Sequence, residues 1–247
     1  MRYLILSDLH SNWEALRAVS DSAAGHFDRV LCLGDLAGYG ANPNEVIDWV
    51  RSHAFAVVRG NHDRACAGLE DLEWFNPVAR AAAEWTHTQL TPENLAYIAA
   101  LPKGPIAVDS FQVMHGSPLD EDEYMIAASD AGQSFPYLES PVAFFGHTHV
   151  QGGFEWVNNR VLAIGSQNSR RQKEIILDLD PDAAYLVNPG SVGQPRDGDP
   201  RAAYVLYDPE DGFLTYHRMD YDIDTAQQKI HRAGLPDFLA ERLALGR

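Results

Sequence analysis

The feature that most constrains the fold of this 247-residue chain is a series of five short polar blocks. They are Asp8-Leu9-His10, Gly34-Asp35, Gly60-Asn61-His62-Asp63, His115-Gly116 and Gly146-His147-Thr148-His149. In four of the five, an apolar run typical of a β-strand leads directly into the polar residues. The ends of parallel strands are rigid and converge on one crevice. The pattern therefore predicts an α/β fold that gathers Asp, Asn and His side chains at one sheet edge.

The first hundred residues alternate between predicted strands and predicted helices. The strands are Arg2–Ser7, Arg29–Leu33 and Phe55–Val58. Ser11-Asn12-Trp13-Glu14 predicts a capping box that opens the first helix, and Asn42-Pro43-Asn44-Glu45 predicts the start of the second. Such βαβ units imply a parallel sheet with the polar blocks at its carboxyl edge.

Residues at about 64–101 are predicted to form a helical, cap-like insertion over the site. The segment is rich in alanine, and Thr91-Pro92 predicts the start of a helix within it. Its aromatic residues are Trp74, Phe75, Trp85 and Tyr97. We expect these side chains to pack onto the main core, and stacking on a substrate is the alternative.

After residue 105 the pattern turns mostly to strands. Asn158-Asn159, between the predicted strands Phe154–Val157 and Val161–Ile164, indicates a tight hairpin. A C-terminal helical tail at about 224–246 is expected to break at Gly234-Leu235-Pro236. Further strands are predicted at Val142–Phe145, Glu174–Leu177, Ala184–Val187, Ala203–Tyr207 and Leu214–Met219. We therefore expect a single domain over residues 1–247, with two sheets between layers of helices.

Composition limits the kinds of binding partner and the cellular compartment that we expect. The chain has 35 acidic and 19 basic residues, and its net charge of −16 disfavours binding to long nucleic acids, which needs a basic face. No apolar run reaches the roughly 18 residues of a membrane span. A cleavable signal peptide would remove the first candidate ligand, Asp8. Cys32 and Cys66 are too far apart in sequence to form a metal-binding pair, and we expect a reducing, cytoplasmic location.

The residue types in the five blocks indicate a metal site. Carboxylate, amide and imidazole ligands without thiolate suit ions such as Mn²⁺, Fe²⁺, Zn²⁺ or Ni²⁺. Two ions with four protein ligands each, one of them shared, need seven side chains. The chain offers Asp8, His10, Asp35, Asn61, His115, His147 and His149. A shared carboxylate can hold two ions about 3.5–4 Å apart, close enough for a bridging hydroxide to attack phosphorus.

Each candidate also has a structural alternative. A histidine after a strand can form a hydrogen bond within the core, and Asp8 or Asp35 can cap a helix or a turn. We expect Asp63 to act in this way, as a cap or by orienting a neighbour, rather than in the chemistry.

The ordered blocks resemble the calcineurin-like metallophosphoesterase superfamily, and in particular its bacterial and archaeal phosphodiesterase-like branch. The shared pattern is Asp-x-His, Gly-Asp, Gly-Asn-His-Asp/Glu, His and Gly-His-x-His, and it covers roughly residues 2–205. The resemblance implies a four-layer α/β/β/α sandwich with two mixed sheets.

The resemblance also implies roles for individual residues. Asp8, His10, Asp35 and His149 would hold one ion, and Asp35 would join Asn61, His115 and His147 on the other. His62 matches the catalytic histidine, which protonates the leaving oxygen or stabilises the transition state. Asn61 and His62 would also contact the substrate.

For the other possible substrate contacts, the sequence leaves more than one role open. The segment 188–196 resembles a loop of the same branch, and its Arg196 is a candidate phosphate contact, with a salt bridge to Asp197 or Asp199 as the alternative. Asn12 either faces the site or caps a helix. The other cationic candidates, which we expect to be solvated, are Arg64, Arg170, Arg171 and Lys173.

A departure from the family pattern narrows the activity. Protein Ser/Thr phosphatases and symmetrical diadenosine tetraphosphatases carry an Arg shortly after the Gly-Asp block, whereas this chain has the run Gly34–Gly40 without Arg. We expect a phosphodiesterase acting on a small nucleotide or a similar diester. The alternatives are a phosphomonoesterase of protein-phosphatase type, a dinucleoside polyphosphate hydrolase and, more remotely, a non-catalytic scaffold. The sequence does not specify the oligomeric state.

Overall fold

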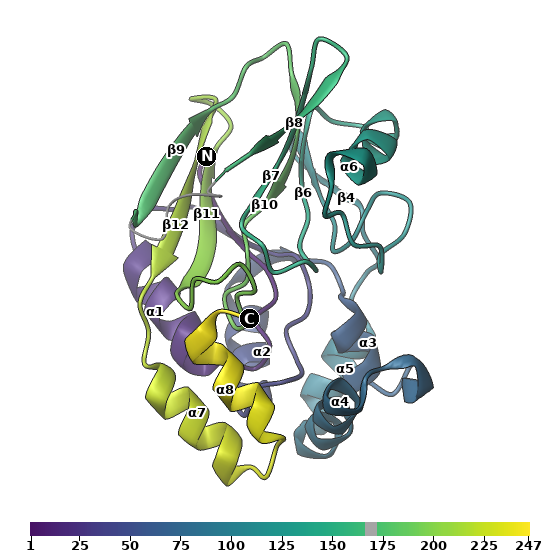
Figure 1. Cartoon of the computed structure of the whole chain (residues 1–247), viewed down its shortest axis with the longest axis vertical. Helices are drawn as coiled ribbons and strands as arrows, with labels where there is room; N and C mark the ends of the chain where they lie inside the picture. The colour runs from purple at the N-terminus through teal and green to yellow at the C-terminus, as the bar shows by residue number, and fades with distance from the viewer. Residues whose placement is uncertain (166–171) are drawn as a thin grey trace.

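The structure of the chain is a computed structural model that describes residues 1–165 and 172–247. Two six-stranded sheets dominate it (Figure 1). The strands of the first sheet are β1 (Tyr3–Leu6), β2 (Arg29–Cys32), β3 (Ala54–Val57), β9 (Glu174–Asp178), β11 (Ala202–Asp208) and β12 (Phe213–Met219). Those of the second are β4 (Ile106–Val108), β5 (Phe111–Val113), β6 (Val142–Phe144), β7 (Gly152–Val157), β8 (Arg160–Ile164) and β10 (Ala184–Asn188).

Both sheets are mixed, as predicted. The first has the order β3-β2-β1-β11-β12-β9 and the second the order β4-β5-β6-β10-β7-β8. β1, β2 and β3 run parallel, and so do β5, β6 and β10. The other neighbouring strands in the described sheets are antiparallel. Each sheet thus contributes a set of parallel strands with their carboxyl ends at one edge.

Side-chain alternation along the strands builds the layers. In β1, Leu4 and Leu6 face α1 (Trp13–Ala23) and α2 (Pro43–His53), while Tyr3 and Ile5 face the second sheet. On the far side of the second sheet, α6 (Ala128–Ser134) packs through Ala131. The order helix, sheet, sheet, helix confirms the predicted four-layer sandwich.

The segment after β3 is helical, as expected. It contains α3 (Asn61–Cys66), the 3-10 helix η1 (Leu72–Trp74), α4 (Pro77–Gln89) and α5 (Pro92–Ala99). Phe75 and Tyr97 pack against the core beneath α1 and α2, and Trp85 packs against a cluster that includes the C-terminal helices. These three aromatic residues therefore contact the core, whereas the side chain of Trp74 lies outside the described part of the structure.

The helical tail also follows the prediction. It consists of α7 (Ile223–Arg232) and α8 (Asp237–Leu245), and the break falls at Gly234, whose φ of 70° lies in the left-handed region that glycine tolerates. Asn158 and Asn159 adopt φ values of 50° and 57° in the hairpin between β7 and β8. None of the described helices is both long and apolar enough to cross a membrane.

The predicted capping box at Ser11 is wrong. The N-cap of α1 is Asn12, whose side-chain oxygen accepts a hydrogen bond from the backbone N–H of Ala15 at 3.1 Å. Ser11 has a φ of 53° and belongs to the loop before the helix. Glu14 pairs with Lys229 of α7 instead of closing a cap.

Candidate metal centre

The carboxyl ends of five parallel strands position the candidate ligands. Asp8 follows β1, Asp35 follows β2, and Asn61 opens α3 just after β3. In the second sheet, His115 follows β5 and His147 follows β6. His10 and His149 lie on the same loops as Asp8 and His147. The two sheets therefore face each other with their ligand-bearing ends on the same side.

The loops that carry these ligands have unusual backbone geometry. Five ligand candidates have positive φ, from 45° to 66°: Asp8, His10, Asp35, His147 and His149. Left-handed backbone costs non-glycine residues on the order of 1–2 kcal/mol each. Such conformations persist only where neighbouring groups fix them, and they cluster at functional sites. The ligand positions are thus held in place at a cost to stability.

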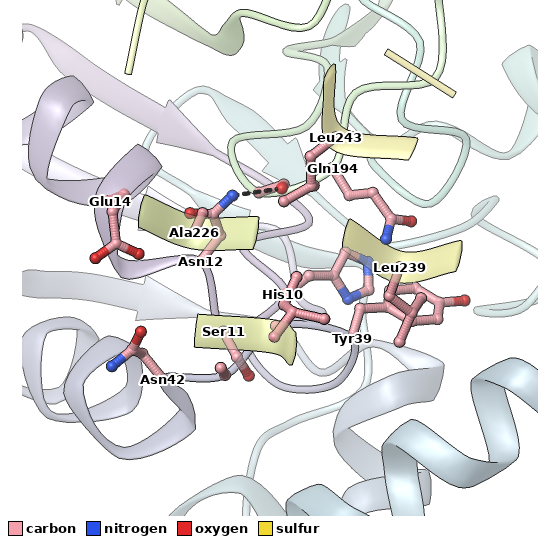
Figure 2. Close-up of a pocket in the computed structure, with 14 residues that line it drawn as sticks. His10, Ser11, Asn12, Glu14, Tyr39, Asn42, Gln194, Ala226, Leu239 and Leu243 are labelled. Carbon is pink, nitrogen blue, oxygen red and sulfur yellow. Dashed lines mark hydrogen bonds between the residues drawn. The ribbon is translucent and has the colours of Figure 1, made fainter. Parts of the chain in front are cut away.

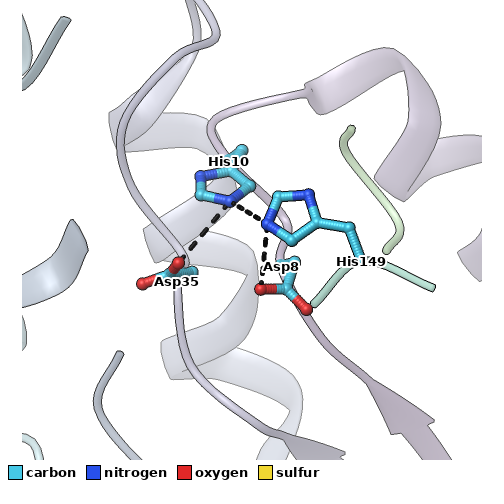
Figure 3. Close-up of side chains that lie close together, drawn as sticks. All are labelled: Asp8, His10, Asp35 and His149. Carbon is cyan, nitrogen blue, oxygen red and sulfur yellow. Dashed lines mark hydrogen bonds and ion pairs between the residues drawn. The ribbon is translucent and has the colours of Figure 1, made fainter. Parts of the chain in front are cut away.

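The side chains form two buried groups that share Asp35. Asp8, His10, Asp35 and His149 place one ligand atom each within 4.8 Å of one another (Figure 3), as do Asp35, His115 and His147. Asp35 Oδ2 lies 3.6 Å from His10 Nε2 and 3.5 Å from His115 Nε2. His149 Nε2 lies 3.3 Å from Asp8 Oδ1. Asp35 is therefore common to both groups, as a bridging ligand would have to be.

Backbone carbonyl groups orient the four imidazoles. One ring nitrogen of each histidine lies within hydrogen-bond distance of a carbonyl oxygen, at 3.1 Å for His10, 2.7 Å for His115, 3.0 Å for His147 and 2.6 Å for His149. A ring nitrogen that donates to a carbonyl leaves the other nitrogen as an acceptor. The free nitrogens are Nε2 of His10, His115 and His149 and Nδ1 of His147. These are the atoms that point into the two groups.

Several buried nitrogen and oxygen atoms that could bind a metal receive no hydrogen bond from the protein, and this fits bound cations. His10 Nε2 lies 3.1 Å from His149 Nε2, and His115 Nε2 lies 3.1 Å from His147 Nδ1. In the neutral, metal-binding form of the rings, with the protons on the carbonyl side, these nitrogens face each other as lone pairs. Asp35 Oδ2 and Asn61 Oδ1 are also buried without a hydrogen-bond partner. Oxygen and imidazole donors of this kind suit divalent cations of the Mn²⁺, Fe²⁺ and Zn²⁺ type.

Burial sets the charge state of most of these ligands. It lowers the pKa of His10 and His149 well below the usual value and that of His147 to about 3, so these rings are neutral and able to bind a metal. Burial raises the pKa of Asp8 to about 7. Burial opposes ionisation of Asp35 as well, but the surrounding imidazoles, chiefly that of His115, hold its pKa well below its usual range. Burial also lowers the pKa of His115, but the Asp35 carboxylate outweighs it and raises this pKa to about 10. His115 is therefore protonated without a metal and must release its proton for Nε2 to bind a cation.

His62 lies beside the two groups without belonging to either. Its backbone N–H donates to Asp35 Oδ1 at 2.8 Å, and its ring lies edge-on to that of His10 at 5.0 Å between centroids. Tyr39 and Phe75 also contact the ring, at 4.3 Å and 5.6 Å. The side-chain Nδ1 is buried and has no hydrogen-bond partner. Burial lowers the pKa of His62 to about 4, so the free protein holds this ring neutral at neutral pH.

Asp63 is a positioning residue. Its carboxylate accepts four backbone hydrogen bonds, from Gly60 and Asp35 at 2.9 Å each, from Leu36 at 2.9 Å and from Ala37 at 3.2 Å. A side chain on Gly60 would overlap the Asp35 carboxylate, which explains the glycine there. Asp63 thus ties the loop of the bridging ligand to the start of α3, in agreement with the orienting role expected from the sequence.

The structure separates the two interpretations of Arg196. Asp197 pairs with Arg218, and Asp199 pairs with Arg201 at 2.6 Å, so neither neutralises Arg196. Arg196 donates to Gln194 Oε1 at 2.9 Å and lies over the ring of Tyr39 at 5.7 Å. Its Nε is buried without a hydrogen-bond partner. No ion pair of Arg196 occurs within the described part of the chain, which leaves its charge available to an anion.

The other candidate contacts are less available. The side-chain N–H of Asn12 donates to the carbonyl of Gly193 at 2.8 Å (Figure 2). Its side-chain oxygen caps α1, so both ends of its amide are engaged. The expectation that Arg64 is solvated is wrong, because its side chain is only 12% exposed and pairs with Glu70, Glu121 and Asp122. Lys173 is exposed and lies 3.9 Å from Asp220. Arg170 and Arg171 lie outside the described residues.

Sequence reasoning missed two aromatic neighbours of the site. Tyr39 packs between His10 and His62, with centroid distances of 4.6 Å and 4.3 Å. Tyr124 lies over the ring of His147 at 3.9 Å. Tyr39 lies in the run Gly34–Gly40, close to the ligand candidate Asp35. This closeness in sequence could have identified it as a neighbour of the site. Tyr124 belongs to no motif, and only the folded chain brings it to the site.

Comparison with known proteins identifies the class. The model of the calcineurin-like phosphoesterase superfamily domain matches residues 1–212, and the chain belongs to this superfamily. An uncharacterized protein of Methanocaldococcus jannaschii is 37% identical over 252 residues, which cover 98% of this chain and 97% of that protein.

Solved structures agree with this assignment. The crystal structure of a metallophosphoesterase from Sphaerobacter thermophilus is 40% identical to this chain, with a TM-score of 0.85, and the match covers 100% of this chain and 99% of the other. A hypothetical protein from Pyrococcus horikoshii shares the fold, with a TM-score of 0.76 at 18% identity over 100% and 98% of the two chains. Family, fold and buried Asp/His groups together make this protein a metal-dependent phosphoesterase.

Proposed function

We propose that the protein is a phosphodiesterase that uses two divalent metal ions and hydrolyses a small nucleotide or a similar diester. Asp8, His10, Asp35 and His149 would hold one ion, and Asp35, Asn61, His115 and His147 the other. Ions held there supply positive charge for the transition state and activate water at neutral pH. Asp35 Oδ2 has no hydrogen-bond partner and lies between His10 and His115, and this shared position is the observation that supports a pair of ions rather than one.

The preference for a diester rests on the charges around the site. A phosphomonoester brings up to two negative charges, whereas a diester brings one. The residues directly after Asp35 are Leu36 and Ala37, both fully buried and uncharged. Arg196 has a buried Nε without a partner and is therefore the cation we assign to the phosphate. One arginine beside the ions suits a monoanionic phosphate better than a dianionic one.

His62 is the group that we assign to the leaving oxygen. Its ring touches those of His10 and Tyr39, and its Nδ1 has no partner in the protein. A phosphoester anion next to the ring favours the protonated form and raises the pKa from the low value that burial imposes. The histidine can then donate its proton to the departing oxygen and become neutral again.

We also propose that the helices at about 64–101 cap this side of the site. Phe75, which precedes α4, contacts the His62 ring edge-on at 5.6 Å. The segment therefore limits the space around the leaving group. Buried, unpaired thiols at Cys32 and Cys66 agree with a cytoplasmic location, which is part of the same proposal.

Two chromogenic esters test the proposal. With Mn²⁺ present, bis-p-nitrophenyl phosphate should be hydrolysed with a higher kcat/KM than p-nitrophenyl phosphate. A preference for the monoester would favour the phosphomonoesterase alternative, and metal binding without turnover of either ester would favour a scaffold. Arg196→Gln should raise KM for the diester more than it lowers kcat, because the arginine binds the phosphate in both the ground and transition states.

A further inference from the structure

Tyr124 occupies an unusual position for a large aromatic side chain. Its ring lies 3.9 Å from that of His147, at an interplanar angle of 31°, yet 47% of the residue is exposed to solvent. A ring that served only to shield a metal ligand would gain most by full burial. Tyr124 instead covers the ligand and also presents aromatic surface next to the metal centre.

The loop that carries Tyr124 is firmly anchored. Glu121 pairs with Arg59 at 2.8 Å and with Arg64 at 3.0 Å, and Asp122 pairs with Arg64 at 2.6 Å. The backbone carbonyl of Asp122 lies 3.0 Å from His147 Nε2. These contacts fix the loop against the second ligand group. The backbone that carries the exposed ring is therefore held beside His147 before a substrate binds.

Cationic and apolar surfaces adjoin this ring. Burial raises the pKa of Tyr124, and the nearby Arg196 guanidinium opposes that rise, as it does for Tyr39. The residues after Tyr124, Met125 and Ile126, line a cavity of ≈ 250 Å³. Its other walls include Phe145, Thr148, Val150 and Phe154. Thr148 stands between the ligand candidates His147 and His149 in the chain, so one residue of the cavity wall belongs to the loop that carries these ligands.

The polar groups of the cavity wall are mostly engaged elsewhere. Asn188 donates to the carbonyl of Gly146 and to Thr148 Oγ1, at 2.9 Å and 3.0 Å. The side chain of Gln151 donates to backbone carbonyls and accepts from Arg218. Ile126 is 72% exposed at the rim. The space therefore offers apolar contact and little hydrogen bonding, which suits a planar aromatic group better than a sugar or a second phosphate.

We propose that Tyr124 and the adjoining cavity bind the aromatic base of a nucleotide whose phosphate lies at the metal centre. This inference rests on the proposed phosphoesterase site and specifies its substrate class as esters that carry a nucleobase. Stacking on a fixed tyrosine is tolerant of base identity, since every base has a π-face. Arg196, close to the same tyrosine, holds the phosphate end.

Equilibrium binding of AMP and of inorganic phosphate to the Mn²⁺-loaded protein tests the inference by calorimetry. The measurements use the His62→Ala background so that AMP is not consumed. Tyr124→Ala should weaken AMP binding by about 10-fold, the usual worth of one stacked base, and leave phosphate binding unchanged. Tyr124→Phe, which keeps the ring, should retain AMP affinity. Tyr137→Ala is the matched control, since this tyrosine is 58% exposed and makes no ring contact with any described site residue.

Other outcomes contradict the inference in distinct ways. If Tyr124→Ala weakens AMP, phosphate and Mn²⁺ binding in parallel, the ring only supports His147 and the inference is wrong. The inference is also wrong if adding Tyr124→Ala to the His62→Ala background leaves the AMP affinity unchanged. Ala163→Trp, which fills the cavity from β8, should weaken AMP but not phosphate binding, and an unchanged AMP affinity would exclude the cavity.

The result is separable from the proposed diesterase activity. If bis-p-nitrophenyl phosphate is not hydrolysed but AMP binding still depends on Tyr124, the diesterase proposal fails and the base site stands. If the diester is hydrolysed and AMP binding ignores Tyr124, only the base site fails.

Discussion

The two halves of the metal centre are covered in different ways. Asp8, His10, Asp35 and His149 are each at most 2% exposed. On the side of His10, a pocket is closed by Leu239 and Leu243 of α8, which lie close to Tyr39 and Gln194 (Figure 2). The half that contains His115 and His147 is bordered instead by the half-exposed ring of Tyr124.

This difference indicates that the covers of the two halves have different roles, one in stability and the other in substrate binding. The residues that cover the first half, Leu239 and Leu243, pack within the protein, so changes in this cover should act mainly on stability. The ligands of the second half are also buried, with His115 0% and His147 3% exposed, but the neighbouring Tyr124 meets solvent. Changes in Tyr124 should therefore act mainly on substrate binding. Asp35 belongs to both groups, and Asp63 holds its loop to α3. Four substitutions test the roles of the shared ligand, its neighbours and the cover.

Asp35→Asn should have the largest effect. The amide removes the negative charge that both groups share, so both ions should be lost and activity should fall more than about 100-fold, beyond the worth of outer contacts to a metal site. Elemental analysis and circular dichroism on the same sample check the loss of metal and the retained fold. Normal metal content in this variant would contradict the bridging role.

His62→Ala should lower kcat by roughly 10²–10⁴, the usual contribution of positioned acid–base help, with metal content nearly unchanged. The reason is that His62 lies beside the ligands without joining them. Rates with bis-p-nitrophenyl phosphate, measured with metal content, check both parts. Full activity in this variant would remove His62 from the chemistry.

Asp63→Asn should weaken metal binding by about 10–100-fold, as expected when an outer contact that orients a ligand is lost. An amide cannot accept the four backbone hydrogen bonds that the carboxylate accepts, because one of its two ends is a donor. Titration with Mn²⁺ measures the affinity. An affinity equal to that of the unchanged protein would show that the Asp35 loop keeps its geometry without Asp63.

Leu239→Ala should have the smallest effect on activity but lower the free energy of unfolding by about 2–5 kcal/mol, because it leaves a cavity beneath the tail. Leu245→Ala, on the exposed end of the same helix, is the control and should change it by no more than about 0.5 kcal/mol. Denaturant unfolding measures both. If Leu239→Ala instead changed KM strongly, the covered half would also take part in substrate binding.

Much of the fold and of the candidate site followed from the sequence because strand ends fix the ligands. Asp8, Asp35 and His147 each come just after a short, continuous apolar run, which is typical of a strand buried on both faces. The strands β4 and β5 were not individually predicted, since Asp109, Ser110 and Gln112 interrupt the apolar run there, whereas the run that contains the equally short β6 is continuous. The cap of α1 was misplaced by one residue, because Ser11 and Asn12 are both good caps and only tertiary contacts decide between them.

Details that depend on long-range pairing could not be predicted. Arg196 is not neutralised, because the neighbouring carboxylates of Asp197 and Asp199 pair with Arg218 and Arg201 instead. The four hydrogen bonds of Asp63 go to backbone N–H groups, which carry no sequence signature. Tyr124 reaches the site through a loop that has no motif of its own.

The central claim is that one site holds two ions and hydrolyses phosphodiesters. The most direct test measures metal content and turnover on the same preparation, by elemental analysis followed by assays with bis-p-nitrophenyl phosphate and p-nitrophenyl phosphate in Mn²⁺. The account predicts about two ions per chain, as in other two-metal sites, and preferred hydrolysis of the diester. No bound metal under any supplement would contradict the assignment of the ligands, and preferred hydrolysis of the monoester would contradict the assignment of the substrate.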